Sequence, residues 1–243
     1  MALPKIDLPL FETQLHSTGE LIKYRPFTVK EEKVLLVAQE SSDPKQMILA
    51  MKQIAGNCCV DIDIETLPMF DLEYVMLQIR AKSVNNEITF TVEDKDTGKP
   101  IEISLVVDDI TLHVPENHSK KIDVSDDMYL MMRYPTLEEV GMFLELASLD
   151  GTEEENNTKV ADTLYDVMIS CIDTVVNGDE VEKLSEYSTD EVTEFIDSFP
   201  GGTIESLKGF FESVPTLRYS TKYTNDEGEE KELVLEGTET FFL

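Results

Sequence analysis

The chain contains 243 residues, of which 41% are hydrophobic and 29% are charged, a composition typical of folded proteins with one or two buried cores. Its 50 acidic residues outnumber its 20 basic residues, and the formal net charge of −30 disfavours binding to nucleic acid and to anionic membranes. No apolar run approaches the roughly 18 residues of a membrane-spanning helix, and the three cysteines suit neither a disulfide framework nor a metal knuckle.

The N-terminal part predicts a β-hairpin followed by three helices. Alternating polar and apolar positions on either side of a Ser-Thr-Gly-Glu turn indicate a hairpin over residues 11–24. Thr28 with a glutamate three positions later forms a capping-box pattern and predicts a helix from about residue 29 to 41. A second helix opens at an Asp-Pro pair and ends near Gly56, and apolar spacing predicts a third that ends near Ser83.

The middle of the chain changes to the alternation of β-strands. Two alternating segments flank a Lys-Asp-Thr-Gly-Lys turn and predict a hairpin over residues 88–105. Further strands are predicted near residues 110–114 and 129–134. We therefore expect a small β-rich module at this point of the sequence.

The sequence pattern predicts a mainly helical C-terminal part. A helix opens at Thr136, the hydrophilic residues 150–157 predict an exposed loop, and apolar spacing predicts one long amphipathic helix over residues 160–176. Two shorter helices, beginning near Ser188 and Ile204, and a closing hairpin over residues 217–235 follow.

These elements predict an α+β fold: an N-terminal β-hairpin plus helices, an inserted β-hairpin module, and a helical C-terminal part that ends in a β-hairpin. The corresponding segments are residues 1–85, 86–134 and 135–243, and the last of these is an acidic region.

The sequence is poor in groups that perform catalysis. His113 and His118 have no zinc-ligand spacing, and the series from Asp61 to Glu65 lacks the glycine and the final glutamate of a calcium loop. No phosphate-binding glycine loop and no nucleophile elbow are present. We therefore expect no catalytic residues, no bound metal and no cofactor.

Two aromatic pairs are candidate anchors for a partner protein. They are Phe210-Phe211 and Phe241-Phe242, the second of which is followed by Leu243 at the end of the sequence. The alternative is that the rings pack within the chain itself. The internal alternative is preferred for Phe210 and Phe211, whereas both alternatives stay open for the terminal residues.

Several short sequence blocks follow one another along nearly the whole chain. One runs from Tyr24 to Lys33, one from Leu67 to Val84 and one from Met132 to Pro135, and further blocks lie toward the C-terminus. Together they resemble the baseplate hub and hub-assembly family of T4-type contractile-tailed bacteriophages. The residues that carry this resemblance are Tyr24, Arg25, Pro26, Phe27, Phe70, Asp71, Arg80, Lys82, Ser83, Tyr134 and Pro135.

The resemblance implies a protein made in the cytoplasm of an infected bacterium, with phage baseplate hub or tape-measure proteins as partners. Three roles stay open: a non-enzymatic, chaperone-like factor for tail assembly, a stoichiometric hub subunit of the virion, and a hub-associated cell-wall hydrolase. The first is preferred because permanent interfaces are depleted of charge, whereas this chain is strongly acidic.

The chain departs from the family at two turns. Many members carry cysteine pairs there that resemble zinc-ribbon knuckles, whereas this sequence has Lys95 to Lys99 in one turn and Asn225 to Glu229 in the other. Because thiolates are needed for such a site, we expect no structural zinc. Turn chemistry and cross-strand packing are expected to hold both hairpins instead.

Overall fold

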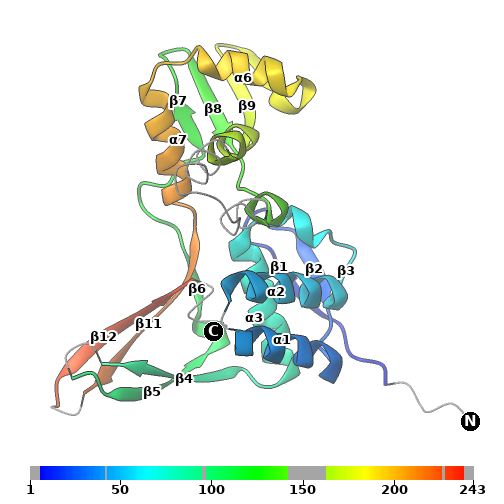
Figure 1. Ribbon diagram of the computed structural model, residues 1–243, viewed down its shortest axis with the longest axis vertical. Helices are drawn as coiled ribbons and strands as arrows, with labels where there is room; N and C mark the ends of the chain where they lie inside the picture. Colours follow the sequence, from blue (N-terminus) through cyan, green and yellow to red (C-terminus); the bar gives the residue numbers. More distant parts are fainter. Residues whose placement is uncertain (1–5, 42, 95–96, 142–162, 226–227, 238–243) are drawn as a thin grey trace, which may run out of the picture. The chain divides into compact units, whose positions relative to one another are not determined.

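The computed structural model describes residues 6–41, 43–94, 97–141, 163–225 and 228–237, and they form two compact units (Figure 1). Unit 1 comprises Met1–His113 and Thr216–Leu243, and unit 2 comprises Val114–Pro215. These boundaries differ from the three segments expected from the sequence, because the C-terminal hairpin pairs with a strand from the N-terminal half of the chain. The predicted α+β class is confirmed.

The N-terminal part of unit 1 combines a small antiparallel sheet with three helices, as predicted. The sheet has the order β1-β2-β3, and its third strand was not predicted. Helix α1 packs on α2, and α2 packs on α3. The elements are β1 (Phe11–Gln14), β2 (Leu21–Tyr24), α1 (Val29–Ser41), α2 (Pro44–Cys58), β3 (Cys59–Val60), a 3-10 helix (Ile64–Thr66) and α3 (Met69–Ser83).

The core of this part is built mainly by α2 and α3. Both helices present apolar side chains at helical spacing, and α3 is buried on most of its circumference. Fully buried side chains include Met47, Met51, Ile54, Leu72, Met76, Leu77 and Ile79.

The remainder of unit 1 consists of two hairpins and one short strand. A 3-10 helix (Val107–Asp109) precedes β6 (Thr111–His113), which pairs with β11 of the C-terminal hairpin, so that the sheet order is β12-β11-β6. The two hairpins are β4 (Glu87–Glu93) with β5 (Pro100–Val106), and β11 (Thr216–Thr224) with β12 (Glu230–Glu236). Both hairpins were predicted from alternation and turn residues.

The turns of the two hairpins are closed in similar ways. In the first, the Asp94 carboxylate accepts a hydrogen bond from the Thr97 backbone N–H at 2.8 Å, and Gly98 has a φ of 65°. In the second, the Asn225 side-chain oxygen accepts from the Glu229 N–H at 2.9 Å, and Gly228 has a φ of 83°. Glycine is suited to both positions because other residues rarely adopt a positive φ.

A partly buried hydrogen bond joins the two hairpins. The Tyr223 hydroxyl, on β11, donates to Asp94 Oδ2 at 2.8 Å, and the Asp94 side chain is buried. The residues involved are far apart in the sequence, so this contact forms only when both hairpins are in place. It therefore couples the β4–β5 turn to the C-terminal hairpin.

Replacing Tyr223 with phenylalanine is expected to loosen both hairpins, because a hydrogen bond to a charged group contributes about 1.5–3 kcal/mol. Peptides from residues 87–106 and 216–236 should exchange their amide hydrogens faster, while peptides from unit 2 keep their rates. Tyr219→Phe is the matched control, since the structure gives the Tyr219 hydroxyl no hydrogen-bond partner among the described residues. Equal exchange in both variants would contradict the coupling.

Unit 2 contains a four-stranded antiparallel sheet and helices that pack on it. The strand order is β10-β9-β8-β7. The elements are β7 (Lys121–Asp123), β8 (Met128–Met132), helical residues 137–141 and 163–170, β9 (Ile172–Asn177), β10 (Glu180–Lys183), a 3-10 helix (Leu184–Glu186), α6 (Thr189–Asp197) and α7 (Gly202–Glu212). The core includes Leu130, Cys171, Ile172, Leu207 and Phe210.

The predicted helix over residues 160–176 is wrong in its second half. The helix ends at residue 170, and Ile172–Asn177 form the strand β9. The residues from Ile172 to Val176 are mainly β-branched, and Asn177-Gly178 begins a tight turn in which Gly178 has a φ of 60°. The predicted loop at 150–157, and Phe143, Leu144 and Ala147 of the helix that opens at Thr136, lie outside the described residues.

Candidate protein-binding surfaces

An arginine and a glutamate hold the start of α1. Arg25 Nη2 lies 3.0 Å from Glu31 Oε1, and the backbone N–H of Thr28 donates to Glu31 Oε2 at 2.7 Å. The N–H of Arg25 also donates to the carbonyl of Cys58 at 2.9 Å, so the same residue contacts the end of α2. Burial by itself raises the pKa of Glu31, but the hydrogen bonds from Arg25 and Thr28 outweigh it and lower the pKa to about 2.

The same arrangement occurs again in unit 2. Arg133 Nη2 lies 2.6 Å from Glu139 Oε1, and the N–H of Thr136 donates to Glu139 Oε2 at 2.8 Å. The N–H of Arg133 donates to the carbonyl of Cys171 at 2.8 Å. Burial again raises the pKa of Glu139, and hydrogen bonds led by that from Arg133 lower it to about 2. Each unit therefore contains one Arg-x-x-Thr-x-x-Glu cluster that contacts a later cysteine.

Two more residues of the family blocks connect distant segments of unit 1. The Asp71 carboxylate accepts hydrogen bonds from the backbone N–H groups of His16, at 2.8 Å, and Ser17, at 3.3 Å, and from the Ser17 hydroxyl. Asp71 is fully buried at the start of α3 and therefore holds the β1–β2 turn. At the other end of α3, the Ser83 hydroxyl accepts from the N–H of Phe27 at 2.8 Å.

The remaining family residues of unit 1 also contribute to packing. Tyr24, Pro26 and Phe70 are buried. Lys82 Nζ lies 5.6 Å from the centroid of the Phe11 ring. The Arg80 side chain is partly buried, and this burial lowers its pKa. These residues hold the unit together and do not form one exposed reactive cluster.

In unit 2, Tyr134 belongs to a stacked ring cluster with His118 and Phe210. The His118 Nε2 atom lies 3.0 Å from the Tyr134 hydroxyl and Nδ1 lies 3.1 Å from the Ser213 hydroxyl. The three rings stack in pairs with centroid distances of 5.4–5.8 Å. Burial and the nearby Lys120 lower the pKa of His118, so its ring is neutral at pH 7.

The three cysteine thiols are free and poorly suited to nucleophilic chemistry. Burial raises the pKa to about 11 for Cys58 and to about 12 for Cys59 and Cys171. They are therefore protonated near neutral pH, whereas the thiolate is the reactive form. Among the residues that the structure describes, no three histidine, cysteine or acidic side chains lie close enough to hold a metal ion.

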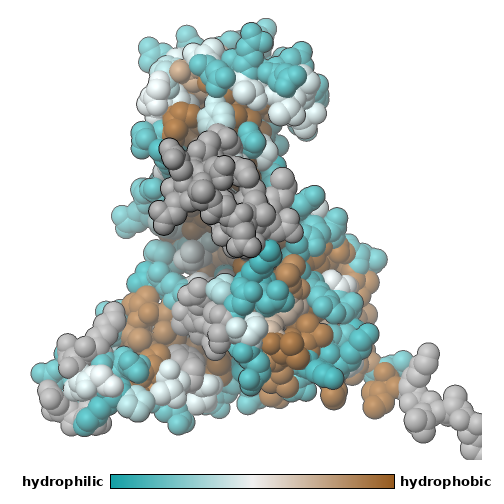
Figure 2. All heavy atoms as spheres, in the orientation of Figure 1, coloured by the Kyte–Doolittle hydropathy of each residue, from teal (hydrophilic) through white to brown (hydrophobic). Residues whose placement is uncertain are grey.

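An apolar groove lies between α1 and α2 on the surface of unit 1. It has a volume of about 540 Å³. Val37 is 63% exposed and Leu49 is 47% exposed, although both are large apolar residues. Figure 2 shows apolar side chains on the surface over these two helices. The groove is lined by Lys30, Lys33, Val34, Val37, Ala38, Ser41, Gln46, Leu49, Ala50 and Gln53.

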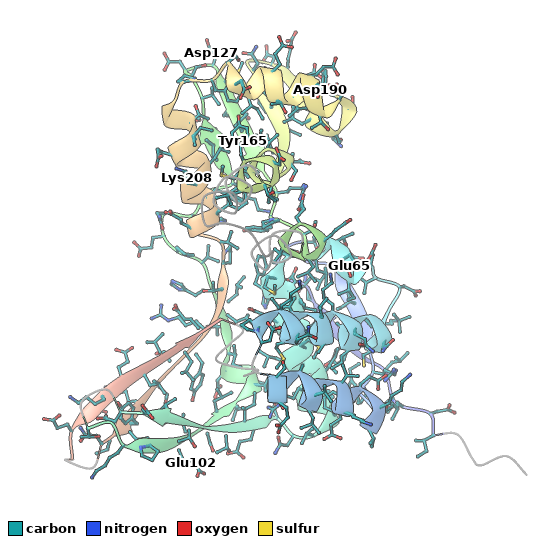
Figure 3. The ribbon with its side chains drawn as sticks, in the orientation of Figure 1. Glu65, Glu102, Asp127, Tyr165, Asp190 and Lys208 are labelled. Carbon is teal, nitrogen blue, oxygen red and sulfur yellow. The ribbon has the colours of Figure 1, made fainter. Side chains whose placement is uncertain are left out.

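A second concave surface, with a volume of about 370 Å³, lies in unit 2 between the sheet and α6. Its apolar floor includes Val175 and Leu184, and Glu180, Glu182 and Glu191 line it as well. The charges around it are typical of this unit, in which Asp127 and Asp190 also lie exposed (Figure 3). The acidic residues around this pocket therefore reflect the acidic composition of the chain and do not by themselves indicate a binding site here.

A model of the T4 bacteriophage base plate protein family matches residues 8–243. The chain belongs to this family. No curated protein and no solved structure matches it. The resemblance inferred from the sequence blocks is therefore confirmed, and the family match covers both units.

Membership of the base plate family places the protein in the bacteriophage virion or in the infected host cell, and its partners among other base plate proteins. Within the described part of the chain, no helix is both long and apolar enough to span a membrane. The described contacts of the family residues lie within unit 1 or within unit 2 and stabilise each unit by itself.

Of the residues expected to anchor a partner, the structure describes Phe210 and Phe211 but not the three at the end of the sequence. Phe210 is 2% exposed in the core of unit 2, and Phe211 is partly buried against the same core. Phe241, Phe242 and Leu243 lie outside the described residues. The α1–α2 groove was not found from the sequence, although four consecutive apolar residues from Val34 to Val37 were a signal for it.

Proposed function

We propose that this base plate protein is a non-enzymatic assembly factor for the baseplate hub, which binds a hub or tape-measure protein during tail assembly. The proposal is supported first by the family match. It is supported next by the position of the family residues, which stabilise the fold and leave the outer surfaces for partner contacts.

The observation that carries the proposal is the exposed apolar groove between α1 and α2. Single exposed apolar residues are common on protein surfaces, but Val37 and Leu49 are both exposed and line the same groove, so they form part of one apolar surface. Apolar surface of this kind is typical of protein interaction sites. A net charge of −30 further favours a soluble factor with a transient interface.

Co-expression with each hub and tape-measure protein of the same phage tests the proposal. We expect one of them to co-purify with this chain or to become soluble only in its presence. Mass spectrometry of purified virions should then find the chain absent or far below the copy number of the hub. A fixed copy number in virions would instead establish a stoichiometric hub subunit, and failure of every co-expression would refute the assembly role.

A further inference from the structure

Helix α1 is apolar on more of its circumference than one core contact requires. Four consecutive apolar residues, from Val34 to Val37, cover a full turn because an α-helix has about 3.6 residues per turn. Leu35 is buried in the unit, whereas Leu36 and Val37 are exposed. A helix that is apolar on opposite sides is typically covered on both sides.

The surface of the groove beside this helix is suited to packing against a further helix. Its lining residues on α1 and on α2 follow the spacing of three and four positions that forms ridges and grooves on helix surfaces. Ala38 and Ala50 are small residues of this lining, and Val37 and Leu49 are large apolar ones. Small side chains allow another backbone to approach closely.

The charge around the groove is opposite to that of the chain. Among the described residues, no aspartate or glutamate lines it, although acidic residues outnumber basic ones by 50 to 20. Lys30 and Lys33 lie along one wall, and neither forms an ion pair with a residue that the structure describes. The groove therefore offers two available cations beside an apolar floor.

We propose that the α1–α2 groove binds an amphipathic α-helix of a partner protein, with acidic side chains next to its apolar stripe. The apolar stripe contacts Val37 and Leu49, and the acidic side chains face Lys30 and Lys33. This inference rests on the proposed function, since it names the chemistry of the partner segment. In helix-in-groove binding of this kind, the side chains of the bound helix that enter the groove lie at positions i, i+3 or i+4, and i+7.

The test uses the full chain and two synthetic 18-residue helical peptides with the same leucine stripe. One peptide carries glutamate beside the stripe, and the other carries lysine at the same positions. We expect the glutamate peptide to bind at least about 10-fold more tightly in a titration followed by fluorescence anisotropy. Equal binding of both peptides, or binding of neither, would overturn the inference.

Variants of the groove identify where the peptide binds. Val37→Gln and the double variant Lys30→Glu/Lys33→Glu are each expected to weaken binding of the glutamate peptide at least about 10-fold. Val84→Gln, at a valine that is 61% exposed elsewhere in unit 1, is the matched control and should bind as the wild type does. Circular dichroism of each variant separates loss of the site from loss of folding, and a folded Val37→Gln variant with unchanged affinity refutes the site.

Two other occupants give different results. If a second copy of the chain fills the groove, Val37→Gln converts a dimer into a monomer in analytical ultracentrifugation. If residues 238–243 of the same chain fill it, their deletion strengthens peptide binding at least about 10-fold. Either result overturns the inference.

The purified complex with the co-expressed hub or tape-measure protein separates this inference from the proposed function. A photo-crosslinking residue at position 37 should join the chain to an acidic, helical segment of the partner, whereas one at position 84 should not. A complex that forms but crosslinks at neither position, or at position 37 to a basic segment, leaves the assembly role intact and refutes the helix-binding site.

Discussion

Replacing Asp71 with alanine is expected to lower the free energy of unfolding by about 3 kcal/mol or more. Its carboxylate is fully buried and accepts hydrogen bonds from two backbone N–H groups, of His16 and Ser17, as well as from the Ser17 hydroxyl. Each hydrogen bond to a charged group contributes about 1.5–3 kcal/mol, and the donors left behind lose their partner. The β1–β2 turn would therefore separate from the start of α3.

Thermal unfolding and hydrogen exchange of the full chain measure this effect. For a chain of this size, a loss of about 3 kcal/mol corresponds to a decrease in Tm of roughly 6–12 °C. Exchange should increase most in peptides that cover residues 11–24 and 69–83. Glu20→Gln, an exposed acidic residue next to the same turn, is the control and should leave both measurements nearly unchanged. A similar effect of both substitutions would contradict the role given to Asp71.

Replacing Glu31 or Glu139 with glutamine is expected to remove about 3 kcal/mol of stability near neutral pH. Each carboxylate has a pKa of about 2 in the folded chain, against about 4.3 in an unfolded chain, and one pKa unit corresponds to about 1.4 kcal/mol. Both side chains are largely buried next to an arginine, so solvent screens this contribution only weakly.

The pH dependence has a defined sign. A folded-state pKa below the unfolded value means that the unfolded chain binds protons more readily, so the stabilisation is present above about pH 5 and disappears as the pH falls toward 2. The difference in unfolding free energy between the wild type and Glu31→Gln should therefore be largest above pH 5 and shrink at lower pH. Chemical denaturation at several pH values measures it.

Each cluster has a matched control on its own helix. Glu32 and Glu138 are exposed glutamates adjacent to Glu31 and Glu139, and their glutamine variants should show little change at any pH. Hydrogen exchange should place the effect of Glu31→Gln in unit 1 and that of Glu139→Gln in unit 2. A pH-independent loss of stability would show that the charge of these residues is not what matters.

Local sequence patterns were sufficient to predict the positions of most of the helices and hairpins. The Thr28 capping box marked the start of α1, and the turn residues before Gly98 and Gly228 marked two hairpins, because such signals involve residues only a few positions apart. The pattern failed at β9, where apolar residues at helical spacing continued into a strand. There the pairing with β8 decided the conformation.

The sequence by itself determined the α+β class, the acidic character of the chain and the order of family blocks that indicated a phage base plate protein. Only the tertiary structure decided that Asp71 holds a turn more than 50 positions away, that β6 pairs with β11, and that Val37 is exposed while Leu35 is buried. The physical reason is that caps and periodicity depend on neighbouring residues, whereas burial and strand pairing depend on segments that meet only in the folded chain.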